Sequence, residues 1–133
     1  MEKVRRRIGE LEKAMGTLKE IFQESYSVVV RDAAIQRFEY TFEVFWKLLR
    51  EYLRECEGIK CNSPKSCFRE ALSAGLMIEE QTITCLEMTD DRNLTSHTYI
   101  EEVAEKIYKR IEDYRQLMEV VFSLVKERLQ GGS

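Results

Sequence analysis

The sequence has few residues that interrupt helices. It contains one proline and six glycines among 133 residues, while 44% of its residues are hydrophobic. Helix interiors tolerate proline and glycine least, so a chain with few of them can form long helices. A single core is usually built from roughly 100 to 150 residues. We therefore expect one helical domain rather than two domains.

The sequence also lacks a long hydrophobic run. Its longest apolar runs are a few residues, such as 28–30, whereas a bilayer-spanning helix needs about 20. The first residues are rich in arginine and then amphipathic, without the apolar stretch and small-residue cleavage site of a secretory signal. We therefore expect no membrane association and a location in the cytoplasm.

Neither sign of charge dominates. The chain has 21 basic and 24 acidic residues, which gives a net charge of -3 at pH 7. Such a balance produces no overall field that would draw the protein to nucleic acid or to an anionic membrane. DNA binding is not expected, and any contact with RNA must come from a local group of basic residues.

The spacing of the cysteines matches no familiar site. The four cysteines are Cys56, Cys61, Cys67 and Cys85. Their number in a chain with a large apolar fraction does not indicate a secreted disulfide scaffold, so free thiols are expected. Zinc sites favour cysteine pairs two to four residues apart, and no such tight pair occurs, so no metal or other cofactor is predicted. A disulfide between Cys56 and Cys67 remains an alternative.

Apolar residues recur with helical spacing through most of the chain. Asp32 is suited to cap a second helix that stops at Gly58, and Ser63 followed by Pro64 is suited to start a third. Thr98 and Glu101 have the spacing of a capping box for the last helix. The helices expected are residues 4–22, 32–57, 64–75, 80–91 and 98–130, with breaks near 25–30 and 95–98.

These elements predict an all-α fold, an antiparallel up-and-down four-helix bundle with one arm split into two short helices. Residues 1–130 form a single domain, and residues 131–133 are expected to be a disordered tail. The aromatic group Phe38, Phe42, Phe45 and Trp46 could stack on a nucleotide, but its helical spacing favours packing in the core. Within the stretch 80–91, Ile83, Leu86 and Met88 are expected to face inward.

The most polar part of the sequence contains its one histidine, His97, and an arginine five positions earlier, Arg92. On a continuous helix these two side chains would point in different directions, but the break expected near Thr95 can bring them together. An imidazole can move the proton of an RNA 2'-hydroxyl while a guanidinium stabilises charge on phosphate oxygens. The alternative is a surface histidine at a helix entry and an arginine paired with Asp90 or Asp91.

Residues 92–99 match the Arg-x4-His-x-Tyr motif of the HEPN superfamily. Residues 31–43, followed by Trp46 and Lys47, then Ser63 and Pro64, then residues 71–76, resemble more narrowly the family of nucleotidyltransferase substrate-binding proteins. The resemblance extends over nearly the whole chain, with the motifs in the expected order. It implies a helical bundle, typically a homodimer, encoded beside a minimal nucleotidyltransferase with which it assembles.

The resemblance also implies roles for particular residues. Relatives with an intact motif are ribonuclease toxins, and the partner nucleotidyltransferase is the antitoxin that can adenylylate the motif tyrosine. By position, Arg92 and His97 would be the catalytic pair, Asn93 a polar helper, and Tyr99 the residue that is modified. In such dimers the two motifs face one cleft, which would supply the second histidine that this chain lacks.

Charge near the motif does not favour RNA. Residues 79–91 contain five acids and no base, so phosphate would be repelled there unless another surface compensates, and this stretch could instead dock a basic protein. A local group of basic residues could form a binding surface or, alternatively, a solvated face. The group consists of Lys60, Lys65 and Arg69, and Arg31 and Arg37 could extend it. On another helix face, Glu39, Glu43 and Lys47 indicate an ion-pair ladder, with a metal-bound nucleotide as the alternative.

Three functions follow from these observations. The favoured hypothesis is a non-catalytic or weakly catalytic subunit that binds a minimal nucleotidyltransferase and helps bind its substrate or nucleotide. The alternative is a metal-independent HEPN ribonuclease toxin that the same partner neutralises through complex formation or adenylylation of Tyr99. The third is a helical scaffold with neither activity.

Overall fold

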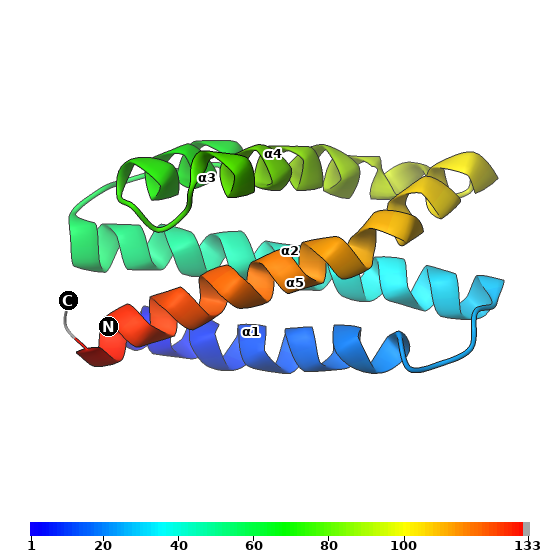
Figure 1. Ribbon diagram of the computed structural model, residues 1–133, viewed down its shortest axis with the longest axis horizontal. Helices are drawn as coiled ribbons and strands as arrows, with labels where there is room; N and C mark the ends of the chain where they lie inside the picture. The colour runs from blue at the N-terminus through cyan, green and yellow to red at the C-terminus, as the bar shows by residue number, and fades with distance from the viewer. Residues whose placement is uncertain (132–133) are drawn as a thin grey trace.

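The computed structural model describes residues 1–131, and all regular secondary structure in this part of the chain is helical, without strands. The elements are α1 (Glu2–Ile21), α2 (Val28–Glu57), α3 (Pro64–Ser73), α4 (Glu79–Asn93), the 3-10 helix η1 (Leu94–His97) and α5 (Glu101–Gly131). Figure 1 shows α1, α2, α4 and α5 running up and down the long axis of the molecule, with both termini at one end. The predicted all-α helical bundle is confirmed.

The two shorter helices share one side of the bundle but lie side by side and do not follow one another end to end. Lys65 at the start of α3 forms a 2.7 Å ion pair with Asp90 near the end of α4. A connection of only five residues, 74–78, joins the other ends of these helices. The chain between α2 and α3 therefore runs back along α2, and α3 and α4 form an antiparallel hairpin (Figure 1).

Helix ends show which capping signals the fold uses. Gly58 ends α2 with a left-handed φ of 68°, and Ser63 caps α3 ahead of Pro64, as the sequence predicts. The predicted start of α2 at Asp32 is wrong, because the Ser27 hydroxyl accepts a hydrogen bond from the Val30 amide and the helix begins at Val28. Ser27 and Asp32 are both suitable capping residues, and the sequence alone did not show which of them caps α2.

The last part of the chain differs from expectation at three points. The capping box of Thr98 and Glu101 does not form, because the Thr98 hydroxyl donates to the Thr95 carbonyl at 3.3 Å. Ile83 is exposed, whereas Met88 is buried and Leu86 is half-buried as expected. Gly131 is still part of α5, so the predicted tail is wrong at that residue, and Gly132 and Ser133 lie outside the described residues.

The aromatic residues of α2 belong to the core. Phe38, Phe42 and Phe45 are almost fully buried, and Trp46 is buried. The Phe42 and Phe45 rings pack against Phe68 of α3, with ring centroids 6.0 and 5.8 Å apart. These side chains therefore join α2 to the α3–α4 hairpin, and the alternative of a nucleotide-stacking surface is wrong.

The cysteines do not all remain free thiols. Cys61 and Cys67 form a disulfide that fastens the α2–α3 connection to α3, whereas Cys56 and Cys85 are free. The expectation of four thiols is therefore wrong, and so is the alternative pair, because the spacing of residues in a connecting segment did not reveal which two meet. Burial raises the pKa of the Cys85 thiol to about 12. Within residues 1–131 no group of three or more metal-ligating side chains occurs.

None of the helices in the described part of the chain combines the length and the apolar character needed to cross a bilayer.

Candidate functional site

The motif residues lie on one short segment at the end of the bundle where α2 begins (Figure 1). Arg92 and Asn93 form the end of α4, His97 is the last residue of η1, and Tyr99 precedes α5. Asn93 and His97 are exposed, Arg92 is half-buried, and 79% of Tyr99 is exposed. The His97 and Tyr99 rings are 6.1 Å apart between centroids. The break expected near Thr95 is thus confirmed as a 3-10 turn that presents His97 and Tyr99 to solvent.

Threonine hydroxyls shape this turn. The Thr95 hydroxyl donates to the Arg92 carbonyl at 2.7 Å, and Thr95 itself is buried. Hydroxyl groups that bond to carbonyls three residues earlier compete with the regular helical hydrogen bonds. The chain therefore leaves α4 without a glycine or proline.

Arg92 is held by an acidic residue of α2 and not by its neighbours in sequence. An Nη2 atom of Arg92 lies 3.2 Å from the carboxylate of Glu43, which also accepts a hydrogen bond from the Trp46 indole and lies 3.9 Å from Lys47. The Glu43–Lys47 part of the predicted ladder is confirmed. No local pattern could have linked Glu43 to Arg92, because the contact depends on how α2 packs against α4.

The guanidinium of Arg92 lies at the edge of an open hollow. This hollow has a volume of about 300 Å³ and is lined by Gln36, Glu39, Tyr40, Glu43 and Arg92. Two of its side chains are carboxylates, and one of them, Glu43, is paired with Arg92. A phosphate that enters the hollow would therefore compete with Glu43 for the Arg92 guanidinium.

Asp91, next to Arg92, fixes the end of α4 on α5. It is 3% exposed and accepts hydrogen bonds from the Arg110 guanidinium, at 3.0 and 3.2 Å, and from the Tyr114 hydroxyl. Burial, followed by this contact with Asp91, raises the pKa of Tyr114 well above its usual value. The alternative in which Arg92 pairs with Asp90 or Asp91 is wrong, since both carboxylates have other partners.

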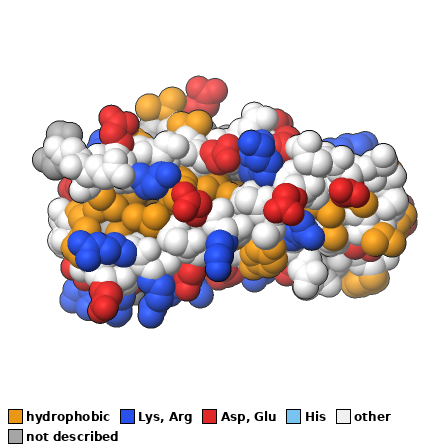
Figure 2. Space-filling model, turned by 90° about the horizontal axis from the view of Figure 1, so that it is seen from below, with side chains coloured by type: hydrophobic (Ala, Val, Ile, Leu, Met, Phe, Trp, Pro, Cys, Tyr) orange, Lys and Arg blue, Asp and Glu red, His pale blue; other side chains and the backbone are white. Residues whose placement is uncertain are grey.

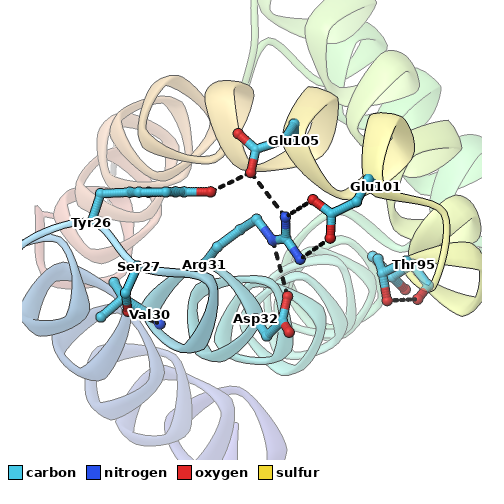
Figure 3. A network of polar contacts seen from close by, with 9 residues as sticks. Tyr26, Ser27, Val30, Arg31, Asp32, Thr95, Glu101 and Glu105 are labelled. Carbon is cyan, nitrogen blue, oxygen red and sulfur yellow. Dashed lines mark hydrogen bonds and ion pairs between the residues drawn. The ribbon is translucent and has the colours of Figure 1, made fainter.

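Arg31 has no exposed guanidinium that could bind RNA, which corrects its assignment to a binding surface. Figure 3 shows its side chain reaching from α2 toward the start of α5, where it bonds to Asp32, Glu101 and Glu105. Only 2% of Arg31 is exposed. Its guanidinium holds the pKa of Glu101 below its usual value, and the Tyr26 hydroxyl and then Arg31 do the same for Glu105. Arg31 therefore ties α2 to α5 two residues after Tyr99.

The other residues assigned to a basic surface have different surroundings. Arg37 donates to the Thr17 carbonyl at 2.7 Å and so links α2 to α1. Lys65 is paired with Asp90, while Arg69 is exposed and forms no ion pair within the described residues. A binding role for Lys65 and Arg69 stays a prediction, and Lys65 would have to leave Asp90 to bind an anion.

The Arg31 network predicts a loss of stability in acid. The folded-state pKa values of Glu101 and Glu105 lie below their usual value of 4.5. The stabilisation that these pairs supply is therefore complete above about pH 4.5 and is lost as the pH falls through the lowered pKa values, because the unfolded chain takes up protons first. Thermal melting followed by circular dichroism between about pH 6 and pH 3 measures this loss.

The matched variant for this prediction is the double substitution Glu101→Gln and Glu105→Gln. Its melting temperature is expected to fall less steeply with acidification than that of the wild-type protein. Parallel curves for the two proteins would contradict the assignment of the acid sensitivity to this network.

The protein has the features of the HEPN class. It is a helical bundle, and one end of the bundle carries Arg92, His97 and Tyr99. Residues 6–127 match the family model described as nucleotidyltransferase substrate binding protein like. The chain therefore belongs to the family of nucleotidyltransferase substrate-binding proteins.

Two similar proteins illustrate this family. The chain is 34% identical over 99 residues to a probable ribonuclease HepT of Haemophilus influenzae, a match that covers 71% of this chain and 65% of that protein. A crystal structure from Thermus thermophilus is 53% identical, covers 86% of this chain and 98% of its own, and superposes with a TM-score of 0.83. The chain matches just under two thirds of the length of the Haemophilus HepT protein.

A third solved structure has a similar fold and is part of a complex. It is a tri-AMPylated HEPN toxin of Shewanella oneidensis in complex with its MNT antitoxin, with 12% identity and a TM-score of 0.78 over 95% of this chain and 98% of its own. At this identity the likeness shows a common fold.

Proposed function

We propose that this protein is the binding subunit of a minimal nucleotidyltransferase and that it docks through the end of the bundle that carries the motif. The observation that supports this proposal is a group of exposed apolar side chains at that end. Exposed apolar groups of this kind mark sites of protein association. They are Tyr26, Val28, Val29, Tyr99 and Ile100, half of the large hydrophobic side chains that are exposed in the described chain.

Tyr99 is the group that this end presents to a nucleotidyltransferase. Its phenol is exposed and makes no hydrogen bond within residues 1–131. In the proposed reaction its oxygen attacks the α-phosphorus of ATP bound to the partner, pyrophosphate leaves, and the phenol proton passes to a base. The product is a tyrosine O-adenylate. The Shewanella toxin supports this proposal, because it is AMPylated and in complex with its MNT antitoxin.

The test is transfer of label from α-phosphate-labelled ATP to the protein in the presence of Mg²⁺ and the minimal nucleotidyltransferase from the same genome. We expect a stable complex by size-exclusion chromatography and labelling of the wild-type protein. Tyr99→Phe should lose the label but keep the complex, because only one hydroxyl is removed. Tyr40→Phe, at another partly exposed tyrosine, is the matched control and should be labelled like the wild type.

The absence of a complex would contradict the docking role. Equal labelling of Tyr99→Phe and the wild type would contradict the assignment of Tyr99 while leaving the docking role intact.

A second function, RNA cleavage, is supported by the chemistry of the motif itself. His97 is exposed on the turn that follows Arg92, and Arg92 borders an open hollow. In this proposal His97 takes the proton of the 2'-hydroxyl, which attacks the phosphorus, and the 5'-oxygen of the next nucleotide leaves. Arg92 stabilises the charge on the phosphate oxygens, and Asn93 assists. A homodimer with facing motifs would provide the second histidine as the acid for the leaving group.

A further inference from the structure

A second concave surface lies at the opposite end of the bundle from the motif. It consists of two adjoining cavities, with volumes of about 160 and 250 Å³, that share Arg50, Glu51, Arg54 and Asn62. The first turns of α1, the last turns of α2 and the connection to α3 form its walls. We call it the basic cleft, after the cations that line it: Lys3, Arg6, Arg7, Arg50, Arg54 and Lys60. Figure 2 shows Lys and Arg side chains gathered at this end of the molecule.

Most of this positive charge is unpaired. Arg7 is paired with Glu10 and Arg50 with Glu51, at 3.0 and 2.9 Å. The remaining cations of the cleft have no carboxylate within ion-pair distance in the described chain; they are Lys3, Arg6, Arg54 and Lys60. A protein with a net charge of -3 thus concentrates unpaired cations in one hollow, and such a hollow attracts anions.

The cleft is also held in shape before a ligand binds. Glu51, only 5% exposed, accepts a hydrogen bond from the Nε atom of Arg50, and the Arg50 guanidinium lies 5.1 Å from the centre of the Trp46 ring. The connection that carries Lys60 is fastened by the bond of the Ile59 amide to the Leu53 carbonyl and by the disulfide of Cys61. Arg50 and the backbone that carries Lys60 are therefore preorganised, and a preorganised site loses less conformational entropy on binding than a flexible one.

The arrangement of the cations matches a chain of phosphate groups. Arg50 and Arg54 are one turn apart on α2. On α1, Lys3 is one turn from Arg6 and Arg7. Each wall of the cleft therefore carries a row of cations. Among the described residues, no aromatic side chain lines either cavity, so they provide no aromatic platform on which a base could stack. The cleft is therefore suited to contact phosphates rather than bases.

We infer that the basic cleft binds the phosphate backbone of a single RNA strand without regard to sequence. The inference goes beyond the proposed function, since it requires neither the nucleotidyltransferase nor an active motif. It also gives RNA a place to bind on a chain whose residues 79–91 are acidic beside the motif.

The test is fluorescence anisotropy with a labelled single-stranded RNA in EDTA, at several salt concentrations. All proteins carry His97→Ala so that the RNA stays intact. The cleft variant adds Arg6→Gln and Arg54→Gln, and the charge-matched control adds Lys13→Gln and Lys106→Gln, which are exposed and outside the cleft. Circular dichroism checks that each variant is folded.

We expect the cleft variant to bind RNA about tenfold more weakly than its parent, with the slope of log K against log salt reduced by about 1.4, or about 0.7 for each phosphate that is no longer neutralised. The control should bind within about twofold of its parent. Equal weakening of both variants would overturn the inference, because binding would then follow net charge alone. No RNA binding by the parent at low salt would overturn it as well. Displacement of the RNA by inorganic tripolyphosphate at equal concentration would also overturn the inference, because the cleft would then be a site for a small polyphosphate.

Discussion

Replacing His97 with alanine is expected to lower the rate of RNA cleavage by at least about 100-fold, because a positioned acid or base contributes about 10² to 10⁴ to such reactions. The chain has one histidine, so no other imidazole can take over the proton transfer. The measurement is the rate at which the purified protein, without its partner, degrades total RNA and transfer RNA in EDTA. EDTA removes metal-dependent contaminating nucleases from the result.

The matched control is Ser96→Ala, which changes the exposed neighbour of His97 on the same 3-10 turn. It should retain most of the wild-type rate, because Ser96 contributes only a weak 3.5 Å bond to the Asn93 carbonyl. Circular dichroism should show both variants to be folded. If the wild-type protein leaves RNA intact, or if His97→Ala cleaves it equally well, the ribonuclease function is contradicted and the nucleotidyltransferase-binding function stands alone.

The second large effect concerns the core behind the site. Phe38 is fully buried, and its ring packs on Phe42 and on Tyr114, with centroids 6.3 and 5.7 Å away. Phe38→Ala should lower the free energy of unfolding by about 3 to 5 kcal/mol, since it removes buried apolar contacts and leaves a cavity. Tyr114 also bonds to Asp91, so the same cavity should loosen the end of α4 that carries Arg92.

Urea unfolding followed by circular dichroism measures this loss. Phe38→Leu is the conservative control, because it keeps most of the buried volume, and it should cost far less than the alanine substitution. A cost below about 1 kcal/mol for Phe38→Ala would contradict the central position of this ring in the core.

Local signals in the sequence were sufficient for much of the fold. The helical spacing of apolar residues located the helices, and Gly58, Ser63 and Pro64 marked boundaries that the structure confirms. These signals act within a few residues of the chain, so they can be read without knowing the fold. Ser27 and Asp32 show the limit of this approach, because both can cap a helix and the sequence favoured the wrong one.

The sequence located the motif but not its surroundings. Residues 92–99 are contiguous, so their resemblance to the HEPN motif was visible, and the polar segment near Thr95 indicated the turn. The ion pair of Arg92 could not be predicted in the same way, because its partner Glu43 lies on α2 and meets Arg92 only when α2 packs against α4. Arg31 looked like a surface cation in the sequence, but the start of α5 brings two carboxylates to it.

The amino-acid sequence by itself determined the class of fold, the family and the segment that carries the motif of that family, because these follow from periodicity and from contiguous residues. The tertiary structure alone decided that Arg31 is a structural residue, that Cys61 and Cys67 are bonded, and that the two ends of the molecule differ. The basic cleft depends on the antiparallel packing of α1 on α2, which brings Lys3 and Arg6 beside Arg50 and Arg54. Residues so far apart in the chain share a site only after the helices pack.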